Sequence, residues 1–190
     1  MDDLAQLAAL LRERNAIDEQ IASLIDYPPH AGHLGEYVAS AIFNIALNQS
    51  KSQKRSDGNF RLGPLAGKSV NIKYQSKQAG LLDLIASTKL ADHPDYYLVL
   101  TGPTSPAAAS RGHSAPWIIA SVFLFDSSLL LAALTQTGAK IGIASSVRSA
   151  VWHEAMIYPQ TGGDAIRLGM ALTDDQRTCL SQFSGILAES

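Results

Sequence analysis

Two short runs of alternating side-chain character, DGNFRL at 57–62 and KSVNIKYQ at 68–75, constrain the fold of this chain more than any other feature. The segment GPLAG lies between them, and its glycines and proline suit a hairpin turn. A period of two puts alternate side chains on opposite faces of a strand. The pattern therefore predicts two adjacent, antiparallel strands at 57–62 and 69–75.

The second of these strands carries polar side chains on one face. Asn71, Lys73 and Gln75 share that face, and the residues between them, which are mostly apolar, share the other. Many nucleases hold a metal ion beside a phosphodiester with a lysine two residues after a carboxylate and an aspartate on the preceding strand, the place that Asp57 takes in this chain. Here the expected carboxylate is the amide of Asn71.

The rest of the chain alternates between helical and strand-like patterns. Helices are predicted at 3–25, with an interruption near Asn15, and at 33–47, where the residues are apolar almost all round. Pro28-Pro29 separates the two, because proline excludes helix at its own position. The remaining elements are expected in this order: an ambiguous helix at 79–90, a buried strand at 95–102, a long loop at 103–116, a strand at 117–125, a helix at 127–136, a strand at 139–144, a helix opened by Ser145-Ser146, a strand at AMIYP, and a last helix from about Thr173.

These elements predict a single domain of the α/β class, a mixed sheet flanked by helices with an N-terminal helical extension. The expected organisation is a helical segment at 1–29, a core at 30–160 and a C-terminal helix at 161–190. The strand at 95–102 should lie in the same sheet as the hairpin, and the helix at 33–47 should pack on that sheet. A chain of 190 residues is long enough to bury such a core.

Composition limits the setting and the partners of the chain. Cys179 is the one cysteine and cannot form an internal disulfide, which favours a reducing, cytoplasmic setting. The apolar run at 115–134 is divided by Pro116 and by Asp126-Ser127-Ser128, so it predicts a strand and a helix rather than a membrane span. The net charge of −2 means that any nucleic-acid binding needs a local basic patch.

Basic residues around the hairpin supply a candidate for that patch. Lys51, Lys54 and Arg55 stand just before Asp57, where they would meet backbone phosphates. The patch is extended by Lys68, Lys77 and Arg148, the last of which follows a predicted helix start whose free N–H groups attract anions. The expected partner is nucleic acid, with DNA favoured, and a homodimer stays open.

The chain resembles the PD-(D/E)xK, or restriction-endonuclease-like, nuclease superfamily in its order of helix, hairpin with Asp and Lys, and further strand. It resembles more closely an uncharacterised bacterial family over roughly residues 15–160. The runs that carry this resemblance are GHLGE at 32–36, DGNF at 57–60, GPL at 63–65, VNIK at 70–73 and DYYLVLTGP at 95–103. The resemblance implies a restriction-endonuclease-like fold but no particular substrate.

Carried over position by position, the resemblance implies Glu36 as the helix acid, Asp57 as the metal aspartate and Lys73 as the lysine. Mg²⁺ or Mn²⁺ would be held by Glu36, Asp57 and the carbonyl of Ile72. Asn71 departs from the acid of the superfamily, and an amide oxygen ligates without charge, so looser metal binding is expected. Glu36 should lie near the strand end that bears Asp57, on the same side of the core as Lys73.

The chemistry explains these residue types. Mg²⁺ prefers oxygen ligands, polarises a phosphate and lowers the pKa of a bound water. The lysine stabilises the negative charge that develops in the transition state.

Two functions from different classes stay open. The first is metal-dependent phosphodiester hydrolysis of DNA, and the second is a catalytically inactive nucleic-acid-binding domain of the same fold. The amide at Asn71 favours the second, whereas Lys73 on a half-buried strand favours an anionic ligand and thus the first. A zinc site of His30, His33 and Glu36 is a weaker alternative, because His30 lies in the bend before the helix.

Overall fold

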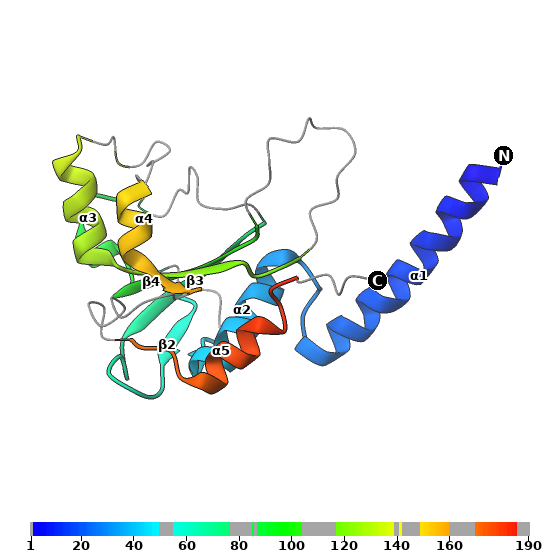
Figure 1. Ribbon diagram of the computed structural model, residues 1–190, viewed down its shortest axis with the longest axis horizontal. Helices are drawn as coiled ribbons and strands as arrows, with labels where there is room; N and C mark the ends of the chain where they lie inside the picture. Colours follow the sequence, from blue (N-terminus) through cyan, green and yellow to red (C-terminus); the bar gives the residue numbers. More distant parts are fainter. Residues whose placement is uncertain are drawn as a thin grey trace.

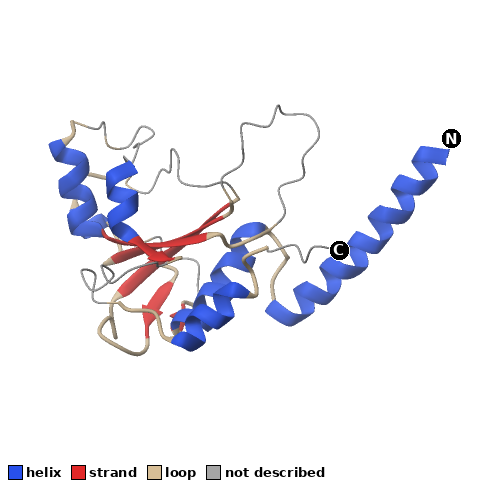
Figure 2. Cartoon of the chain, viewed as in Figure 1, coloured by secondary structure: helices blue, strands red, loops and turns tan. Residues whose placement is uncertain are grey.

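The computed structural model describes residues 2–49, 55–76, 85, 87–103, 117–138, 141, 149–159 and 170–185. Within these residues a six-stranded mixed sheet is flanked by helices on both faces, and a long N-terminal helix extends away from it (Figure 1 and Figure 2). The α/β class, the mixed sheet and the N-terminal helical extension predicted from the sequence are confirmed.

The first helix, α1 (Asp2–Ile25), is continuous over 24 residues, so the predicted interruption near Asn15 does not occur. Arg14 and Asp18, one turn apart, form an ion pair of 3.5 Å that spans this point. Asp26 has a positive φ of 58° and ends the helix before the two prolines. Among the described residues, no helix has the length and hydropathy that a membrane span requires.

The second helix, α2 (Ala31–Phe43), is shorter than the predicted helix at 33–47, because residues 45–47 form strand β1 (Ile45–Leu47). The change occurs at Asn44, whose backbone is left-handed with φ of 53°. Asparagine adopts this conformation more readily than most residues, so it ends the helix here. The prediction of a helix to residue 47 is wrong because an apolar run alone does not separate a buried helix from a strand.

The sheet has the strand order β1-β2-β3-β4-β5-β6. β3 and β4 are parallel, and the other neighbouring strands are antiparallel. The predicted antiparallel pairing of the strands at 57–62 and 69–75, with the 95–102 strand in the same sheet, is confirmed. The strands after β1 are β2 (Gly58–Phe60), β3 (Ser69–Gln75), β4 (Tyr96–Thr101), β5 (Ser121–Asp126) and β6 (Met156–Tyr158).

Helix α3 follows β5, and helix α4 precedes β6, in the order that the sequence predicts. α3 (Ser127–Gln136) begins at the DSS sequence, where the carboxylate of Asp126 accepts the N–H groups of Ser128 at 2.9 Å and Leu129 at 3.1 Å. α4 (Ser149–Ala155) runs directly into β6. The strand predicted from residue 117 starts later, at Ser121.

The last helix, α5 (Asp174–Ser181), begins as predicted at the N-cap Thr173 with a capping box. The side chain of Gln176 also donates to the carbonyl of Ile42 at 3.0 Å, which joins α5 to the end of α2. A short 3₁₀ helix, η1 (Leu90–Asp92), precedes β4. The predicted elements at 79–84, 104–116 and 142–148 lie outside the described residues, as do most of the predicted strand at 139–144 and the start of the helix at Ser145-Ser146.

Two apolar clusters lie on opposite faces of the sheet. On one face, Val70, Ile72 and Tyr74 of β3 pack with residues of α2 and α5. On the other face, Tyr97 and Val99 of β4 pack with residues of α3 and α4. Because side chains alternate along a strand, Asn71, Lys73 and Gln75 belong to the second face. The alternation expected from the sequence therefore decides which helices each side chain of β3 meets.

Candidate functional site

Asp57 precedes β2 at the point where β2 stops pairing with β3. Its N–H donates to the carbonyl of Val70 at 2.9 Å, and its carbonyl accepts the N–H of Asn48 at 2.8 Å. Gly58 is required next, because a Cβ built there would lie 2.3 Å from the carbonyl oxygen of Ala46. The DG sequence thus fixes the backbone of Asp57 tightly between two strands.

The carboxylate of the half-buried Asp57 turns toward the backbone of β3. Its Oδ2 accepts the N–H of Ile72 at 2.7 Å, one rung beyond the last β2–β3 pair, Gly58 with Val70. In an extended strand the N–H and C=O of one residue point to the same edge, so the Ile72 carbonyl faces this edge too. Asp57 and the Ile72 carbonyl therefore lie on the same edge of β3, just before β2 begins.

Asn71, the residue between Val70 and Ile72, supplies a third oxygen on this part of β3. The last β2–β3 pair sets Gly58 level with Val70, and the Asp57 N–H also donates to the Val70 carbonyl, so Asp57 lies against the Val70–Ile72 segment. The Oδ1 atom of Asn71 is buried and has no hydrogen-bond partner. A buried acceptor without a partner carries a desolvation cost, and among the described residues this oxygen keeps its capacity to accept a hydrogen bond or ligate a cation.

These three oxygens fit a hard divalent cation. Mg²⁺ and Mn²⁺ accept carboxylate, amide and carbonyl oxygens together with several waters. The arrangement supplies a single formal negative charge, from Asp57. Consistent with that, the described part of the chain has no cluster of three or more His, Cys, Asp or Glu residues that would hold a metal.

Lys73 stands two residues after Asn71 on the same face of β3, about 7 Å along the strand. Its side chain is exposed, and no hydrogen bond or ion pair joins it to another residue in the described ranges. An exposed ammonium on the same strand face as Asn71 is accessible to an anionic ligand.

The polar row on β3 continues beyond the residues singled out from the sequence as a site. Gln75 is paired in register with Thr101 of β4, and the Oε1 and Oγ1 atoms of these two residues are also buried without partners. The position of Gln75 on this face was predicted from the same alternation of side chains that placed Asn71 there. Thr101 was not predicted, because a threonine that ends the apolar run YYLVLT looks like an ordinary strand residue.

Glu36 lies on α2, which packs on the face of β3 opposite to the one that bears Asn71 and Lys73. Gly35 of α2 packs directly on Tyr74, since a Cβ built at Gly35 would lie 2.7 Å from the Tyr74 Cβ. α2 therefore covers the face of β3 that bears Tyr74, whereas Lys73 belongs to the opposite face. The expected placement of Glu36 and Lys73 on one side of the core is not formed, and metal ligation by Glu36 stays a prediction.

The predicted basic patch is described only in part. The exposed Arg55 donates to the carbonyl of Ala91 at 2.8 Å and pairs with Asp92 at 3.5 Å. Lys68 pairs with Asp95 at 3.2 Å. Both cations thus reach toward the segment before β4. The other predicted members, Lys51, Lys54, Lys77 and Arg148, lie outside the described residues.

The zinc alternative gains no support from the histidines. His33 lies with its Nδ1 2.9 Å from the carbonyl oxygen of Pro28, to which it donates. His30 is the N-cap residue of α2 and contacts the ring of His33 at a centroid distance of 5.6 Å. In the described ranges these rings form no metal-holding group with Glu36.

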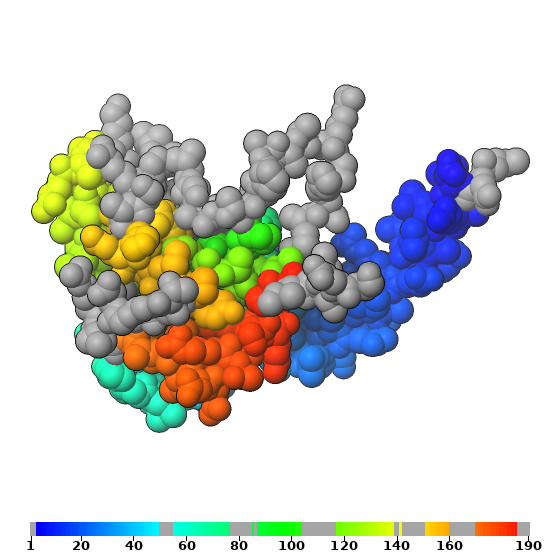
Figure 3. All heavy atoms as spheres, viewed as in Figure 1, coloured from blue at the N-terminus to red at the C-terminus, as the bar shows by residue number. Residues whose placement is uncertain are grey.

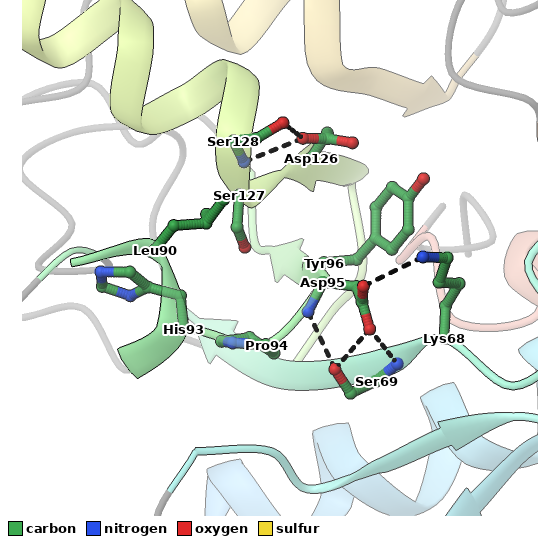
Figure 4. A pocket seen from close by; sticks show the side chains of 10 residues that line it. All are labelled: Lys68, Ser69, Leu90, His93, Pro94, Asp95, Tyr96, Asp126, Ser127 and Ser128. Atoms are coloured by element: carbon green, nitrogen blue, oxygen red, sulfur yellow. Dashed lines mark hydrogen bonds and ion pairs between the residues drawn. The ribbon is translucent and has the colours of Figure 1, made fainter.

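A second polar cluster lies at the other end of β3, where β3 and β4 begin (Figure 4). The Asp95 carboxylate accepts the N–H of Ser69 at 2.9 Å, its hydroxyl at 2.7 Å, and the Lys68 ammonium at 3.2 Å. The N–H of Asp95 donates back to the Ser69 Oγ at 2.9 Å. Burial alone would raise the pKa of Asp95, but the hydrogen bonds from Ser69 and Lys68 together hold it below its ordinary value.

This cluster borders a half-open pocket of about 330 Å³ that also includes His93, Tyr96 and Ser127. The Oγ of Ser127 is buried there without a partner. His93 is fully engaged, with Nδ1 2.8 Å from the Tyr97 hydroxyl and Nε2 2.7 Å from the Ser87 carbonyl. The sequence analysis did not single out this region, although an aspartate just before a buried strand is a recognisable capping signal.

No protein-family model matches the chain, and no curated protein matches it either. The fold therefore defines a class, an α/β protein with a mixed six-stranded sheet. The oxygens at Asp57, Asn71 and Ile72 define a candidate cation site on that sheet.

Proposed function

We propose that this protein is a metal-dependent phosphodiesterase that hydrolyses DNA. The edge formed by Asp57, Asn71 and the Ile72 carbonyl would hold Mg²⁺ or Mn²⁺, and Lys73 would contact the phosphate. The observation that carries the proposal is the buried, unpartnered Oδ1 of Asn71 beside a carboxylate. Only a donor or a cation satisfies that oxygen, and the neighbouring carboxylate favours a cation.

Each residue of this site has a role that follows from its position. Asp57 supplies the negative charge and is kept in place by the hydrogen bond from the Ile72 N–H. Asn71 and the Ile72 carbonyl complete one side of the coordination shell, and a bound cation polarises the phosphate and lowers the pKa of a coordinated water. Lys73 stabilises the charge that accumulates on the phosphate oxygens in the transition state.

The order of elements supports this assignment. α2, β1, β2 and β3 follow one another, and β4 is parallel to β3. The resemblance to the PD-(D/E)xK superfamily implies the same sequence of a helix, a hairpin with Asp and Lys, and a further strand. The variant motif Asn71-x-Lys73 differs from that pattern by one charge. Weaker cation binding is therefore expected, so cleavage should require a high cation concentration.

A second candidate is a nucleic-acid-binding domain of this fold without catalysis. The same amide favours it, because a site with one carboxylate grips a cation less strongly than a site with two. In this case Lys73 and the basic residues near Asp57 would contact phosphates without any cation. The two candidates differ in whether cleavage occurs at all.

The deciding experiment compares cleavage of double-stranded DNA, single-stranded DNA and RNA by the highly purified protein, with Mg²⁺, with Mn²⁺ and with excess chelator. The critical variant is Asp57→Asn, because its amide oxygen still accepts the Ile72 N–H while the charge is lost. Asp175→Asn, on the exposed first turn of α5, removes the same charge far from the site. We expect cation-dependent cleavage of DNA that Asp57→Asn lowers by roughly 10²–10³-fold or more and that Asp175→Asn leaves unchanged.

Cleavage that persists in chelator, or in Asp57→Asn, contradicts the proposal. A wild-type protein that binds DNA with a strong salt dependence but never cleaves it supports the second candidate instead. In that outcome Lys73→Ala should weaken binding and reduce its dependence on salt, whereas Asp57→Asn should not weaken it.

A further inference from the structure

α1 leaves most of its apolar side chains uncovered. It extends from the rest of the molecule as the long blue arm of Figure 3, and only its last residue, Ile25, is buried. Six of the twelve exposed large hydrophobic residues in the described ranges lie on this one helix. They are Leu4, Leu7, Leu10, Leu11, Ile17 and Leu24, with exposures between 46% and 72%.

These side chains form a continuous seam. Six positions of α1 follow one another with alternate spacings of three and four residues. They are Leu7, Leu10, Arg14, Ile17, the half-buried Ile21 and Leu24. This is the heptad spacing of helices that pair along their length. In that frame Leu7, Arg14 and Ile21 share one core position, and Leu10, Ile17 and Leu24 share the other. The helix is about 36 Å long, or more than three heptads.

We propose that α1 is a dimerisation element that pairs antiparallel with α1 of a second copy of this chain. In the antiparallel register the two core positions alternate across the interface. Leu7 then lies level with the partner copy's position 24, and Leu10 level with its position 21. Each apolar seam residue except Ile17 meets an apolar residue, so the seam is complementary to itself, as a two-fold interface requires.

Arg14 decides the orientation. A parallel pair would set two arginines face to face in the seam, which like charges disfavour. The antiparallel pair sets Arg14 opposite Ile17 and one residue from the level of Asp18, its ion-pair partner at 3.5 Å within the helix. The charge of α1 also disfavours an anionic membrane as the occupant of the seam, because the helix carries five acidic residues and two arginines.

The interface should be modest, because it rests on one helix from each copy and a stable interface commonly buries about 800 Å² per partner. A concentration-dependent equilibrium between monomer and dimer is therefore expected.

Sedimentation equilibrium of the full chain over a wide concentration range measures the dissociation constant of this dimer. Leu10→Glu should raise the dissociation constant roughly 30-fold or more, as for a central hot-spot residue. Ala16→Glu, an exposed position on the other side of the helix, adds the same charge and should leave it unchanged.

Disulfide formation tests the orientation, in a background where the exposed Cys179 is replaced by serine. Leu10→Cys combined with Ile21→Cys should give a linked dimer, and Leu10→Cys alone should not. The two positions are about 16 Å apart along one helix, so they cannot link within one chain. A protein that stays monomeric at every concentration, or a dimer that Leu10→Glu does not weaken, overturns the proposal. A linked dimer from Leu10→Cys alone overturns the antiparallel arrangement.

Discussion

Two carboxylates contact β3, one at its start and one at its middle, and their surroundings differ. Asp95, at the start, accepts both polar hydrogens of Ser69 and an ion pair from Lys68. Asp57, at the middle, accepts the N–H of Ile72, and the preceding residue Asn71 has a buried Oδ1 without a partner among the described residues.

The difference lies in the carboxylates themselves: several protein groups donate to the Asp95 carboxylate, although the Ser127 Oγ nearby is unpartnered among the described residues, whereas the Asp57 carboxylate accepts a single N–H. A network in which every member has a partner rigidifies the fold and has little capacity left for a ligand. A cluster with an unpartnered buried oxygen leaves its coordinating capacity free, at some cost in stability. Asp95 is therefore interpreted as a clamp between β3 and β4, and Asp57 as part of a binding site.

The largest expected effect compares Lys73 on β3 with Lys68 just before it. Lys73→Ala should lower DNA cleavage by roughly 10²–10³-fold, the usual cost of one group that stabilises transition-state charge. Lys68→Ala removes the ion pair to Asp95 and a predicted phosphate contact, so it should weaken DNA binding but leave the cleavage rate at saturating DNA nearly unchanged. Rates at saturating DNA and cation measure both. Equal losses in the two variants would mean that the lysines act only as a general basic surface.

The next effect is on the free energy of unfolding. It should be larger for a substitution at Asp95 than for one at Asp57. Asp95→Ala removes the acceptor of three hydrogen bonds at a partly exposed site, so unfolding in urea should become easier by about 1–2 kcal/mol. Asp57→Asn keeps an acceptor for the Ile72 N–H and should cost less than about 0.5 kcal/mol. A large destabilisation by Asp57→Asn would indicate that Asp57 is a structural clamp like Asp95.

Asn71→Asp should strengthen cation binding at the site formed with Asp57. The new carboxylate restores a second ligand charge, so the Mg²⁺ concentration that gives half-maximal cleavage should fall by about tenfold, which corresponds to 1.4 kcal/mol. Titration of the cleavage rate with Mg²⁺ measures this. Asn15→Asp, on the exposed surface of α1, adds the same charge away from the site and serves as the control. An unchanged cation requirement in Asn71→Asp would remove Asn71 from the coordination shell.

The smallest effect is the dependence of stability on pH. The pKa of Asp95 is lower in the folded protein than its ordinary value of 3.8, so its contribution is present above that value. The contribution is lost as the pH falls through the lower, folded pKa. Melting temperatures measured from neutral to strongly acidic pH should therefore fall more steeply for the wild type than for Asp95→Asn. Because Asp95 is partly exposed, the difference should be small.

Much of the sheet could be predicted from local sequence. The alternation in KSVNIKYQ placed Asn71 and Lys73 on one face and fixed the pairing with the strand that follows Asp57. The start of α3 at Asp126 and that of α5 at Thr173 also followed from capping residues. These features depend on neighbours within a few positions in the chain.

The features that decide the site depend on packing between distant elements. The face of the sheet that α2 covers is set by the contact of Gly35 with Tyr74, and no local pattern reports it. The placement of Glu36 away from Lys73 followed from that contact. Likewise, the hydrogen bond from Ile72 to Asp57 depends on β2 beginning at Gly58, and strand boundaries are the least certain part of a prediction from sequence.

The most direct test of the account is to locate Mn²⁺ on the protein by NMR. Paramagnetic broadening of backbone amide signals is recorded as Mn²⁺ is added to the ¹⁵N-labelled wild type and to Asp57→Asn. We expect the amide signals of Asp57, Ile72 and Lys73 to broaden before all others in the wild type, and not to do so in Asp57→Asn. Broadening that begins around Asp92 and Asp95, or that is the same in both proteins, would contradict a cation site at this edge of β3.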